Sequence, residues 1–154
     1  MQKLIYCSGH GISQILESEE KNIGDQLISF INTKVLSNGL KLSIPEKNKN
    51  PKYREILNKK EINKIYNFLK NQDYKPDMST WNRRNRDYTQ KLQSLDFLDV
   101  ASVLRDIIVL ENHKKLSFGE KKTKEQALKL LADEIHCVTK EPLAHIKENL
   151  SKKF

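Results

Sequence analysis

The sequence is poor in the residues that stabilise small secreted domains or span membranes. Only two of its 154 residues are cysteine, Cys7 and Cys137, which is too few for a disulfide framework, so both are expected to be reduced thiols. No stretch approaches the ~20 consecutive apolar residues of a membrane span, and the N-terminus lacks the charged and apolar sections of a signal peptide. These absences predict a cytoplasmic protein with no membrane partner.

Motifs that would indicate catalysis or metal binding are also missing. The sequence contains no Walker loop and no GxGxxG motif for phosphate groups. The pairs Cys7/His10 and His136/Cys137 are isolated, whereas a structural metal site needs four ligands. Most carboxylates lie within four residues of a lysine or arginine, as on a solvated helix face. We therefore expect no enzymatic activity, no metal and no cofactor.

Positive charge is what the sequence has in excess. It has 28 Lys and Arg against 20 Asp and Glu, a net charge of +8, and residues 59–154 hold 20 of these basic and 14 of these acidic side chains. Such an excess favours a polyanionic partner. An alternative is that the Lys- and Asn-rich composition reflects the base composition of the genome alone.

The apolar residues of the first third recur at every second position, which is typical of β-strands. Asn38-Gly39 predicts a hairpin with a type I′ turn, followed by a strand that alternates up to Pro45. At least four short strands within the first third of the chain leave too little room for crossover helices. They therefore predict an antiparallel sheet that is strongly curved or closed into a small barrel. The other expected strands lie near Leu4–Tyr6, Gly11–Leu16 and Leu27–Leu36.

From residue 59 onward the apolar spacing becomes helical, and cap residues predict where the helices begin. The fold class expected is therefore α+β, with a β domain at 1–50, a linker at 51–58 and a helical bundle at 59–154. The expected helices are Lys59–Asn71 after the cap Asn58, one after Ser79, Phe97–Lys114 after the cap Asp96, one opened by the capping box Ser117/Glu120, and one beginning near Pro142.

The most informative segment is Ser79–Lys91, STWNRRNRDYTQK, which sets the only tryptophan at the start of a helix among cations. An arginine fork can hold two phosphate oxygens, and an indole can stack on a base or wedge between base steps. The spacing also permits the opposite interpretation, in which Trp81 continues a buried stripe with Tyr88 and Leu92. The candidate DNA-contacting residues are Trp81, Arg83, Arg84, Arg86 and Lys91.

The order of motifs along the whole chain resembles the CarD/CdnL family of bacterial transcription regulators. The family's N-terminal Tudor-like β-barrel binds the RNA polymerase β subunit, and its helical domain contacts promoter DNA. The motifs that carry the resemblance are YCSGHG at Tyr6–Gly11, LKLSIPEKN after the Asn-Gly turn, YREI at Tyr53–Ile56, WNRRNR at Trp81–Arg86, VLRDI at Val103–Ile107 and KLSFGEKK at Lys115–Lys122.

The resemblance implies a monomeric, nucleoid-associated regulator that stabilises the open complex. Trp81 matches the tryptophan that enters the minor groove at the upstream edge of the −10 bubble, with weak sequence specificity, and Arg83, Arg84 and Arg86 match its DNA-facing neighbours. The implied polymerase-binding residues are Lys21, Lys41, Ser43 and Arg54. Two departures are a shortened first strand and Ser43 in place of an arginine. The alternative function is a DNA-binding repressor or nucleoid-associated protein that acts without polymerase.

Overall fold

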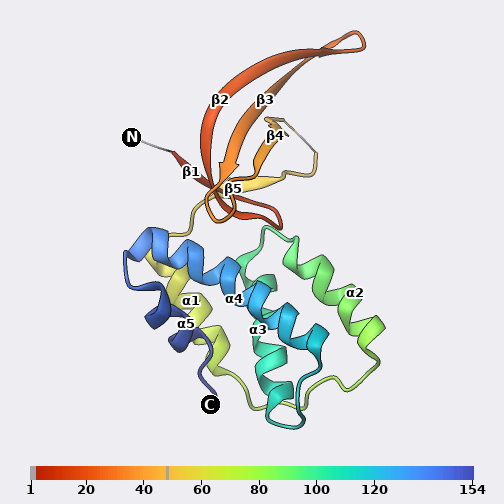
Figure 1. Ribbon diagram of the computed structural model, residues 1–154, viewed down its shortest axis with the longest axis vertical. Helices are drawn as coiled ribbons and strands as arrows, with labels where there is room; N and C mark the ends of the chain where they lie inside the picture. Colours follow the sequence, from red (N-terminus) through yellow and green to blue (C-terminus); the bar gives the residue numbers. More distant parts are fainter. Residues whose placement is uncertain (1–2, 48) are drawn as a thin grey trace. The chain divides into compact units, whose positions relative to one another are not determined.

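The computed structural model describes residues 3–47 and 49–154, which form two compact units (Figure 1). The sheet unit ends at Ile56 and contains every strand, and the helical unit begins at Leu57 and contains every helix of the described residues. The α+β class predicted from the sequence is therefore confirmed. Asn48, the last residue of the motif LKLSIPEKN, lies outside the described residues.

The sheet unit is a single antiparallel sheet of five strands in the order β4-β3-β2-β1-β5. Cys7 and Ile5 of its inner strand, together with Ile44, form a small apolar core. Burial raises the pKa of the Cys7 thiol, and both cysteines are free. The strands are β1 (Leu4–Cys7), β2 (Gly11–Ile23), β3 (Gln26–Val35), β4 (Lys41–Pro45) and β5 (Tyr53–Glu55).

The expectation of a closed barrel is wrong, because the sheet stays open between its two edge strands. Within the described residues β4 pairs only with β3 and β5 pairs only with β1. Pro45 at the end of β4 has no N–H to donate to a further strand, and β5 is only three residues long. Strand β5 lies inside the segment 51–58 that the sequence suggested as a linker.

Strand β2 runs further than the sequence suggested, through the polar stretch that follows Leu16. It pairs with β3 up to Ile23 and Gln26, and Gly24 turns the chain with a φ of 62°. Both faces of this extension meet solvent, so the apolar/polar alternation that reveals a half-buried strand is absent. The tip also leaves Ile23 and Leu27 exposed.

The loop before β4 differs from the predicted type I′ turn. That turn needs a positive φ at two residues, but of Asn38 and Gly39 only Gly39 has one. Val35 N donates to Leu40 O and Gly39 N donates to Val35 O, so the loop between the strands is wider than two residues. The Asn38 side chain accepts a hydrogen bond from Leu40 N and stabilises this wider loop.

The helical unit begins its helices where the cap residues predict. Asn58 and Ser117 each form a capping box with the glutamate three residues on, and Asp96 accepts a hydrogen bond from Leu98 N. Pro142 is the N-cap of the last helix. The helices are α1 (Lys59–Lys70), α2 (Trp81–Leu92), α3 (Phe97–Glu111), α4 (Phe118–Thr139) and α5 (Leu143–Leu150).

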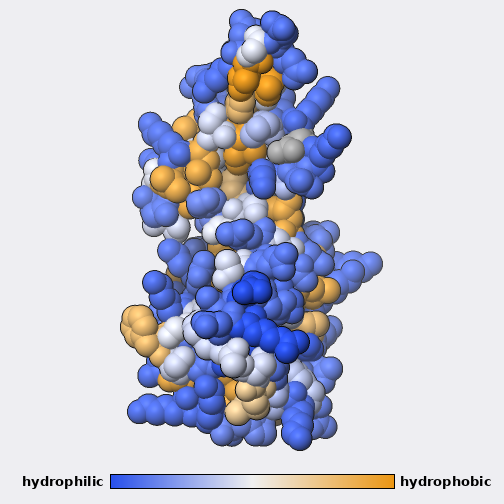
Figure 2. Space-filling view, turned by 90° about the vertical axis from the view of Figure 1, so that its right-hand side faces the viewer, coloured by the Kyte–Doolittle hydropathy of each residue, from blue (hydrophilic) through white to orange (hydrophobic). Residues whose placement is uncertain are grey.

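Helix α3 forms the centre of the helical unit, since most of its apolar side chains are buried. Helices α1, α2 and α4 all pack against it, and α5 packs against α4. On the face drawn in Figure 2, the exterior of the helical unit is mostly hydrophilic and its hydrophobic atoms emerge in small separate groups. None of the helices described is long and apolar enough to cross a lipid bilayer.

Candidate nucleic-acid interface

Trp81 is the first residue of α2 and lies at the edge of the helical core rather than inside it. Its indole is partly buried and packs against the core, with its ring centroid 6.4 Å from that of Tyr88. The other side of the contact is α4, where Gly119 leaves room for the indole. A Cβ at Gly119 would come within 2.9 Å of Trp81 Cζ2. The packed part of the indole agrees with the interpretation of Trp81 as a core residue, and the accessible part leaves a DNA contact sterically open.

Arg84 is a correction to the expected set of DNA-contacting residues, because it points into the helical unit. Its side chain is 6% exposed, and its Nη1 donates to Glu120 Oε2 at 2.8 Å. Its Nε donates to Ser79 O at 3.0 Å, and its guanidinium carbon lies 5.5 Å from the Trp81 ring centroid. One helical turn places Arg84 on the same side of α2 as Trp81 and Tyr88. Arg84 therefore supports the indole from within the fold.

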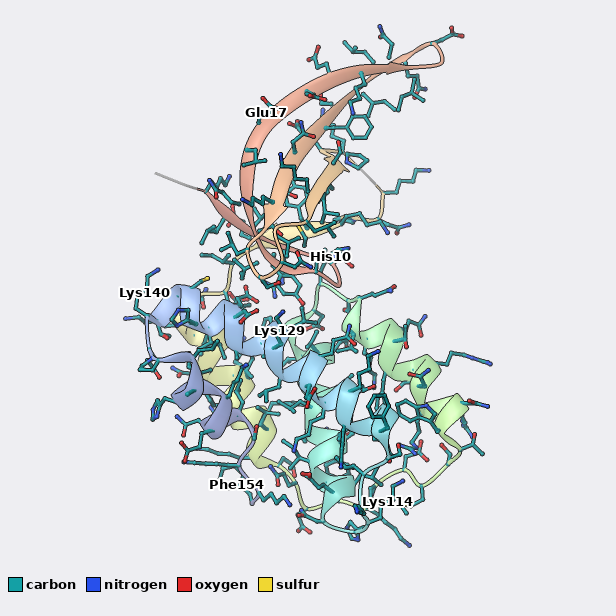
Figure 3. All side chains as sticks on the ribbon, in the orientation of Figure 1. His10, Glu17, Lys114, Lys129, Lys140 and Phe154 are labelled. Atoms are coloured by element: carbon teal, nitrogen blue, oxygen red, sulfur yellow. The ribbon has the colours of Figure 1, made fainter. Side chains whose placement is uncertain are left out.

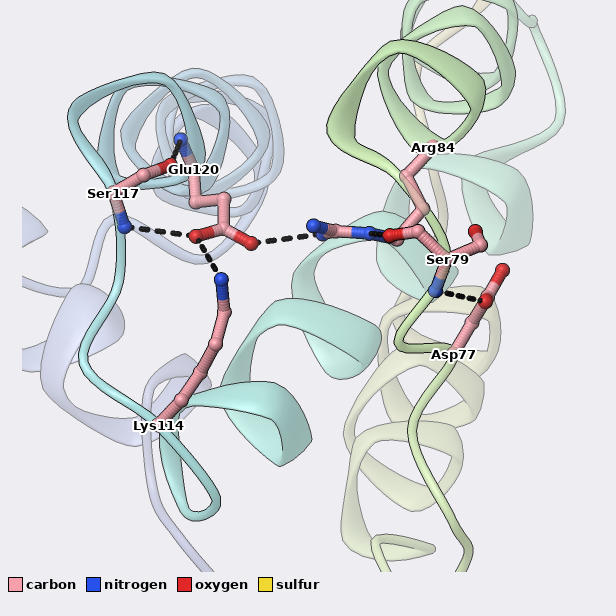
Figure 4. A network of polar contacts seen from close by, with 6 residues as sticks. All are labelled: Asp77, Ser79, Arg84, Lys114, Ser117 and Glu120. Carbon is pink, nitrogen blue, oxygen red and sulfur yellow. Dashed lines mark hydrogen bonds and ion pairs between the residues drawn. The ribbon is translucent and has the colours of Figure 1, made fainter.

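Glu120 connects α2 with the first turn of α4 through a fully buried carboxylate (Figure 4). Besides Arg84, it accepts hydrogen bonds from Ser117 N at 2.8 Å and from Lys114 Nζ at 2.9 Å. Burial by itself raises the pKa of a carboxyl group, but these hydrogen bonds outweigh it and hold the pKa of Glu120 at about 2. The carboxylate is therefore ionised at neutral pH and ties the two helix starts together.

The segment before α2 is ordered by a short hydrogen-bonded turn. Asp77 Oδ1 accepts from Ser79 N at 2.8 Å, which lowers the pKa of Asp77 (Figure 4). Thr80 is the N-cap of α2 but makes no side-chain capping bond. The turn at Asp77 and the bond from Arg84 to Ser79 O thus fix the chain just before the indole.

The remaining cations of the segment lie on the outer side of α2. Arg83 and Arg86 are exposed, so their guanidinium groups are accessible to phosphates. Lys91 is half-buried and pairs with Asp87 at 3.2 Å across one helical turn. Of the five expected DNA-contacting residues, the structure therefore brings four to the outside or the edge of the helical unit: Trp81, Arg83, Arg86 and Lys91.

The four residues expected to bind polymerase lie on three different strands of the sheet unit. Lys41 and Ser43 are exposed on the edge strand β4. Lys21 lies on the extended part of β2, where its Nζ is 3.5 Å from Glu19 Oε2 and 5.4 Å from the Phe30 ring centroid. Arg54 lies on the other edge strand, β5, with its guanidinium carbon 4.1 Å from the Tyr6 ring centroid.

The sequence did not indicate two of the residues that shape the site, Glu120 and Gly119. Glu120 was expected only as a helix-capping partner, and Gly119 was not singled out. A usable signal for Glu120 is that it is the only carboxylate in the otherwise basic segment 113–124, so a basic partner nearby was predictable. Gly119 has no such signal, because its role depends on the approach of a side chain from another helix.

Within residues 3–47 and 49–154, no group of three or more His, Cys, Asp or Glu is arranged to hold a metal ion.

The comparison with known protein families bears on the helical unit. Residues 64–151 match the family model described as CarD, C-terminal domain, and this match covers more than half of the chain. Members of this family are non-enzymatic regulators of transcription that associate with RNA polymerase. The chain belongs to the CarD family of transcription regulators.

Proposed function

We propose that this protein stabilises the open promoter complex by binding the polymerase β subunit through its sheet unit and promoter DNA through its helical unit. The observation that supports the DNA contact is the partly exposed indole of Trp81. It begins a helix, packs on Gly119 and lies beside two exposed arginines. An aromatic ring with cations around it suits a distorted base step between two phosphate rows.

The DNA contacts divide between the ring and the cations. Trp81 enters the minor groove at the upstream edge of the −10 bubble, while Arg83, Arg86 and Lys91 bind phosphates on either side. Because phosphate contacts carry no sequence information, the specificity expected from this set is weak. Arg84 is not among the contacts, since its guanidinium is buried against Glu120.

Stabilisation of the open complex follows from differential binding. A ring that engages only the distorted junction binds the open complex and not the closed one, so it shifts the equilibrium toward opening. A preference of ~1.4 kcal/mol changes the ratio tenfold. A modest DNA affinity is sufficient, because attachment to polymerase raises the effective concentration of the helical unit at the promoter. A rigidly held indole also loses little conformational entropy on binding.

The polymerase contact is assigned to exposed polar residues of the sheet unit. Lys41 and Ser43 lie on the edge strand β4, and Lys21 lies on the extended β2–β3 hairpin. Arg54 on β5 completes the set. This assignment is supported by the family's association with RNA polymerase and by the accessibility of Lys21, Lys41 and Ser43.

The test is the lifetime of open complexes formed with the full-length protein, polymerase from the same organism and promoter DNA. Trp81→Ala should shorten this lifetime about tenfold, on the ~1.4 kcal/mol scale above. The open-complex lifetime of Trp81→Phe, which keeps an aromatic ring, should lie between those of Trp81→Ala and the wild type. Lys129→Ala, which removes an exposed charge from α4, serves as the matched control and should match the wild type (Figure 3). A Trp81→Ala lifetime equal to that of the wild type would reject the DNA contact.

The same proteins separate this function from that of a DNA-binding repressor or nucleoid-associated protein that acts without polymerase. In a pull-down, the full-length protein should retain the purified β subunit, and Trp81→Ala should retain it equally well. Lys41→Glu, which reverses an exposed charge on β4, should weaken this retention. A protein that retains no β subunit and protects DNA equally with and without polymerase would favour the alternative.

A further inference from the structure

Helices α1 and α3 border a groove that none of the contacts described above uses. It has a volume of about 420 Å³, and we call it the α1–α3 groove. The residues that line it are three or four positions apart along α1 and seven apart along α3, so each helix contributes one face. They are Lys64, Asn67, Phe68 and Asn71 from α1 and its C-cap, and Leu98 and Arg105 from α3.

Arg105 is held in this groove without a charged partner. Its guanidinium carbon lies 3.9 Å from the centroid of the Phe68 ring and 4.9 Å from that of the Tyr74 ring, so two aromatic rings position it. Among the residues that the structure describes, its buried Nε finds no hydrogen-bond partner and its charge forms no ion pair. The neighbouring carboxylate of Asp106 accepts a hydrogen bond from the Tyr74 hydroxyl instead. The guanidinium is therefore fixed in place but not neutralised.

The rest of the α1–α3 groove combines further donors with apolar surface. Lys64, Asn67 and Asn71 are exposed, whereas Phe68 and Leu98 are half-buried. Of the described residues that line the groove, none is acidic. Arginine and lysine bind carboxylates, and carboxamides can form hydrogen bonds with a peptide backbone. The lining is thus complementary to a protein segment in which an acidic side chain lies beside an apolar one.

A protein segment fits this groove better than a nucleic acid does. DNA presents rows of phosphates that several cations bind at once, whereas the groove offers one fixed guanidinium and one lysine around apolar side chains. Helices α1 and α2 both pack against α3 and lie on different sides of it (Figure 1). A protein segment in the groove therefore leaves the proposed DNA contact of Trp81 accessible.

We propose that the α1–α3 groove binds an acidic segment of the polymerase holoenzyme, and this inference rests on the function proposed above. An Asp or Glu carboxylate of that segment binds the Arg105 guanidinium and the Lys64 ammonium, and an apolar neighbour packs on Phe68 and Leu98. Polymerase is the partner because the family associates with it and because the helical unit is held beside it in the proposed complex. The helical unit thus has a polymerase contact of its own, in addition to those proposed for the sheet unit.

The first test measures the affinity of the full-length protein for polymerase holoenzyme without DNA, so that the DNA contact does not contribute. Lys64→Glu and Asn67→Glu each place a negative charge in the groove and should weaken binding about threefold to tenfold, because like charges then face each other. Lys70→Glu is the matched control and should bind like the wild type, since Lys70 is exposed on the same helix but does not line the groove. Equal affinities for the three variants and the wild type would overturn the proposal.

Arg105→Lys tests the planar guanidinium itself. This variant keeps the positive charge but loses the rigid fork of donors, so it should also bind holoenzyme more weakly than the wild type. Its unfolding midpoint is measured by Trp81 fluorescence, because Arg105 also stacks on Phe68. A stable Arg105→Lys that binds like the wild type would reject the role of the guanidinium. If Arg105→Lys is unstable, the exposed positions Lys64 and Asn67 decide.

A crosslink identifies what binds in the groove. The photo-crosslinking amino acid p-benzoylphenylalanine replaces Asn67 in the full-length protein, and complexes are formed with polymerase holoenzyme and promoter DNA. Position 67 should crosslink to a polymerase subunit, at a peptide that contains Asp or Glu, whereas position 70 should not. Crosslinking of position 67 to DNA, or to nothing, would overturn the proposal.

The results for the wild type and Trp81→Ala separate this proposal from the proposed function. If the wild type does not bind holoenzyme, the proposed function fails and the groove contact fails with it. If the wild type binds and Trp81→Ala shortens the open-complex lifetime, but the groove variants bind like the wild type, only the groove contact is rejected.

Discussion

The two units hold their candidate contact residues in different ways. In the helical unit, Trp81 is positioned by the buried Arg84–Glu120 pair and by the surface at Gly119. In the sheet unit, Lys21 contacts Glu19 and the Phe30 ring, which are both on the same hairpin. The proposed DNA contact therefore depends on the fold of its unit, whereas the exposed residues proposed to bind polymerase can be changed without unfolding theirs.

The largest expected effect of this difference is on stability. Glu120→Gln leaves the buried Arg84 guanidinium without its counter-charge, which typically costs 3–5 kcal/mol of unfolding free energy. The matched control is Glu19→Gln, which breaks the exposed Lys21 pair of the sheet unit and should change stability by less than about 1 kcal/mol. Urea unfolding followed by Trp81 fluorescence measures the helical unit, because the chain has one tryptophan, and amide hydrogen exchange of β2 and β3 measures the sheet unit.

A double variant makes this prediction sharper. Arg84→Met/Glu120→Leu removes both charges and replaces them with apolar side chains, so it should recover much of the stability that Glu120→Gln loses. Equal losses in Glu120→Gln and Glu19→Gln would show that the two units do not differ in the way described.

The second effect is a dependence of stability on pH. The pKa of Glu120 is about 2 in the folded chain against an ordinary value of 4.5, so the unfolded chain takes up the proton first as the pH falls. The contribution of this group is fully present above about pH 5 and is lost between about pH 4.5 and pH 2. From the size of the shift it amounts to roughly 3 kcal/mol.

Unfolding free energies at pH 7 and pH 3 measure this contribution. The difference in stability between the wild type and Glu120→Gln should shrink as the pH falls, because protonation removes from the wild type the charge that the variant lacks. A difference that stays constant over this range would show that the carboxylate is not held ionised by Arg84, Lys114 and Ser117.

Local signals predicted the helical unit better than the sheet unit. Asn58, Asp96 and Ser117 cap helices at the positions expected, because capping depends on residues only three or four apart. The end of β2 was missed because the strand beyond Leu16 has solvent on both faces and hence no alternation. Closure of the sheet was also mispredicted, since it depends on whether β4 and β5, which follow one another in the chain but form opposite edges of the sheet, pair with each other.

The candidate site was predictable in its location but not in its division of roles. The run of arginines indicated a basic helix start, yet its composition does not distinguish Arg84 from Arg83. The spacing does, because Arg84 is three residues after Trp81 and four before Tyr88, on the apolar side of α2. The partner Glu120 lies on another helix, 36 residues away, and only the tertiary structure shows that the two meet.

The smallest expected effect on stability, and the most selective one on function, comes from Gly119→Ala. Alanine favours a helix by ~1 kcal/mol over glycine, but its Cβ would lie 2.9 Å from Trp81 Cζ2, so the two effects oppose each other. The net change in unfolding free energy should stay within about 1 kcal/mol, while the indole is displaced. Trp81 fluorescence should shift, open-complex lifetime should fall, and retention of the β subunit should be unchanged.

Gly24→Ala in the sheet unit is the matched control. At Gly24 the backbone conformation disfavours a side chain, whereas at Gly119 a close contact does. A Cβ at Gly24 meets nothing within 4 Å, but the residue has a φ of +62°, which costs a side chain about 1 kcal/mol. It should therefore lose stability in the sheet unit without changing Trp81 fluorescence. If Gly119→Ala leaves both the Trp81 fluorescence and the open-complex lifetime as in the wild type, the surface of α4 does not position the indole. The proposed difference between the two units, in which the fold of the helical unit positions its contact residue, would then be rejected.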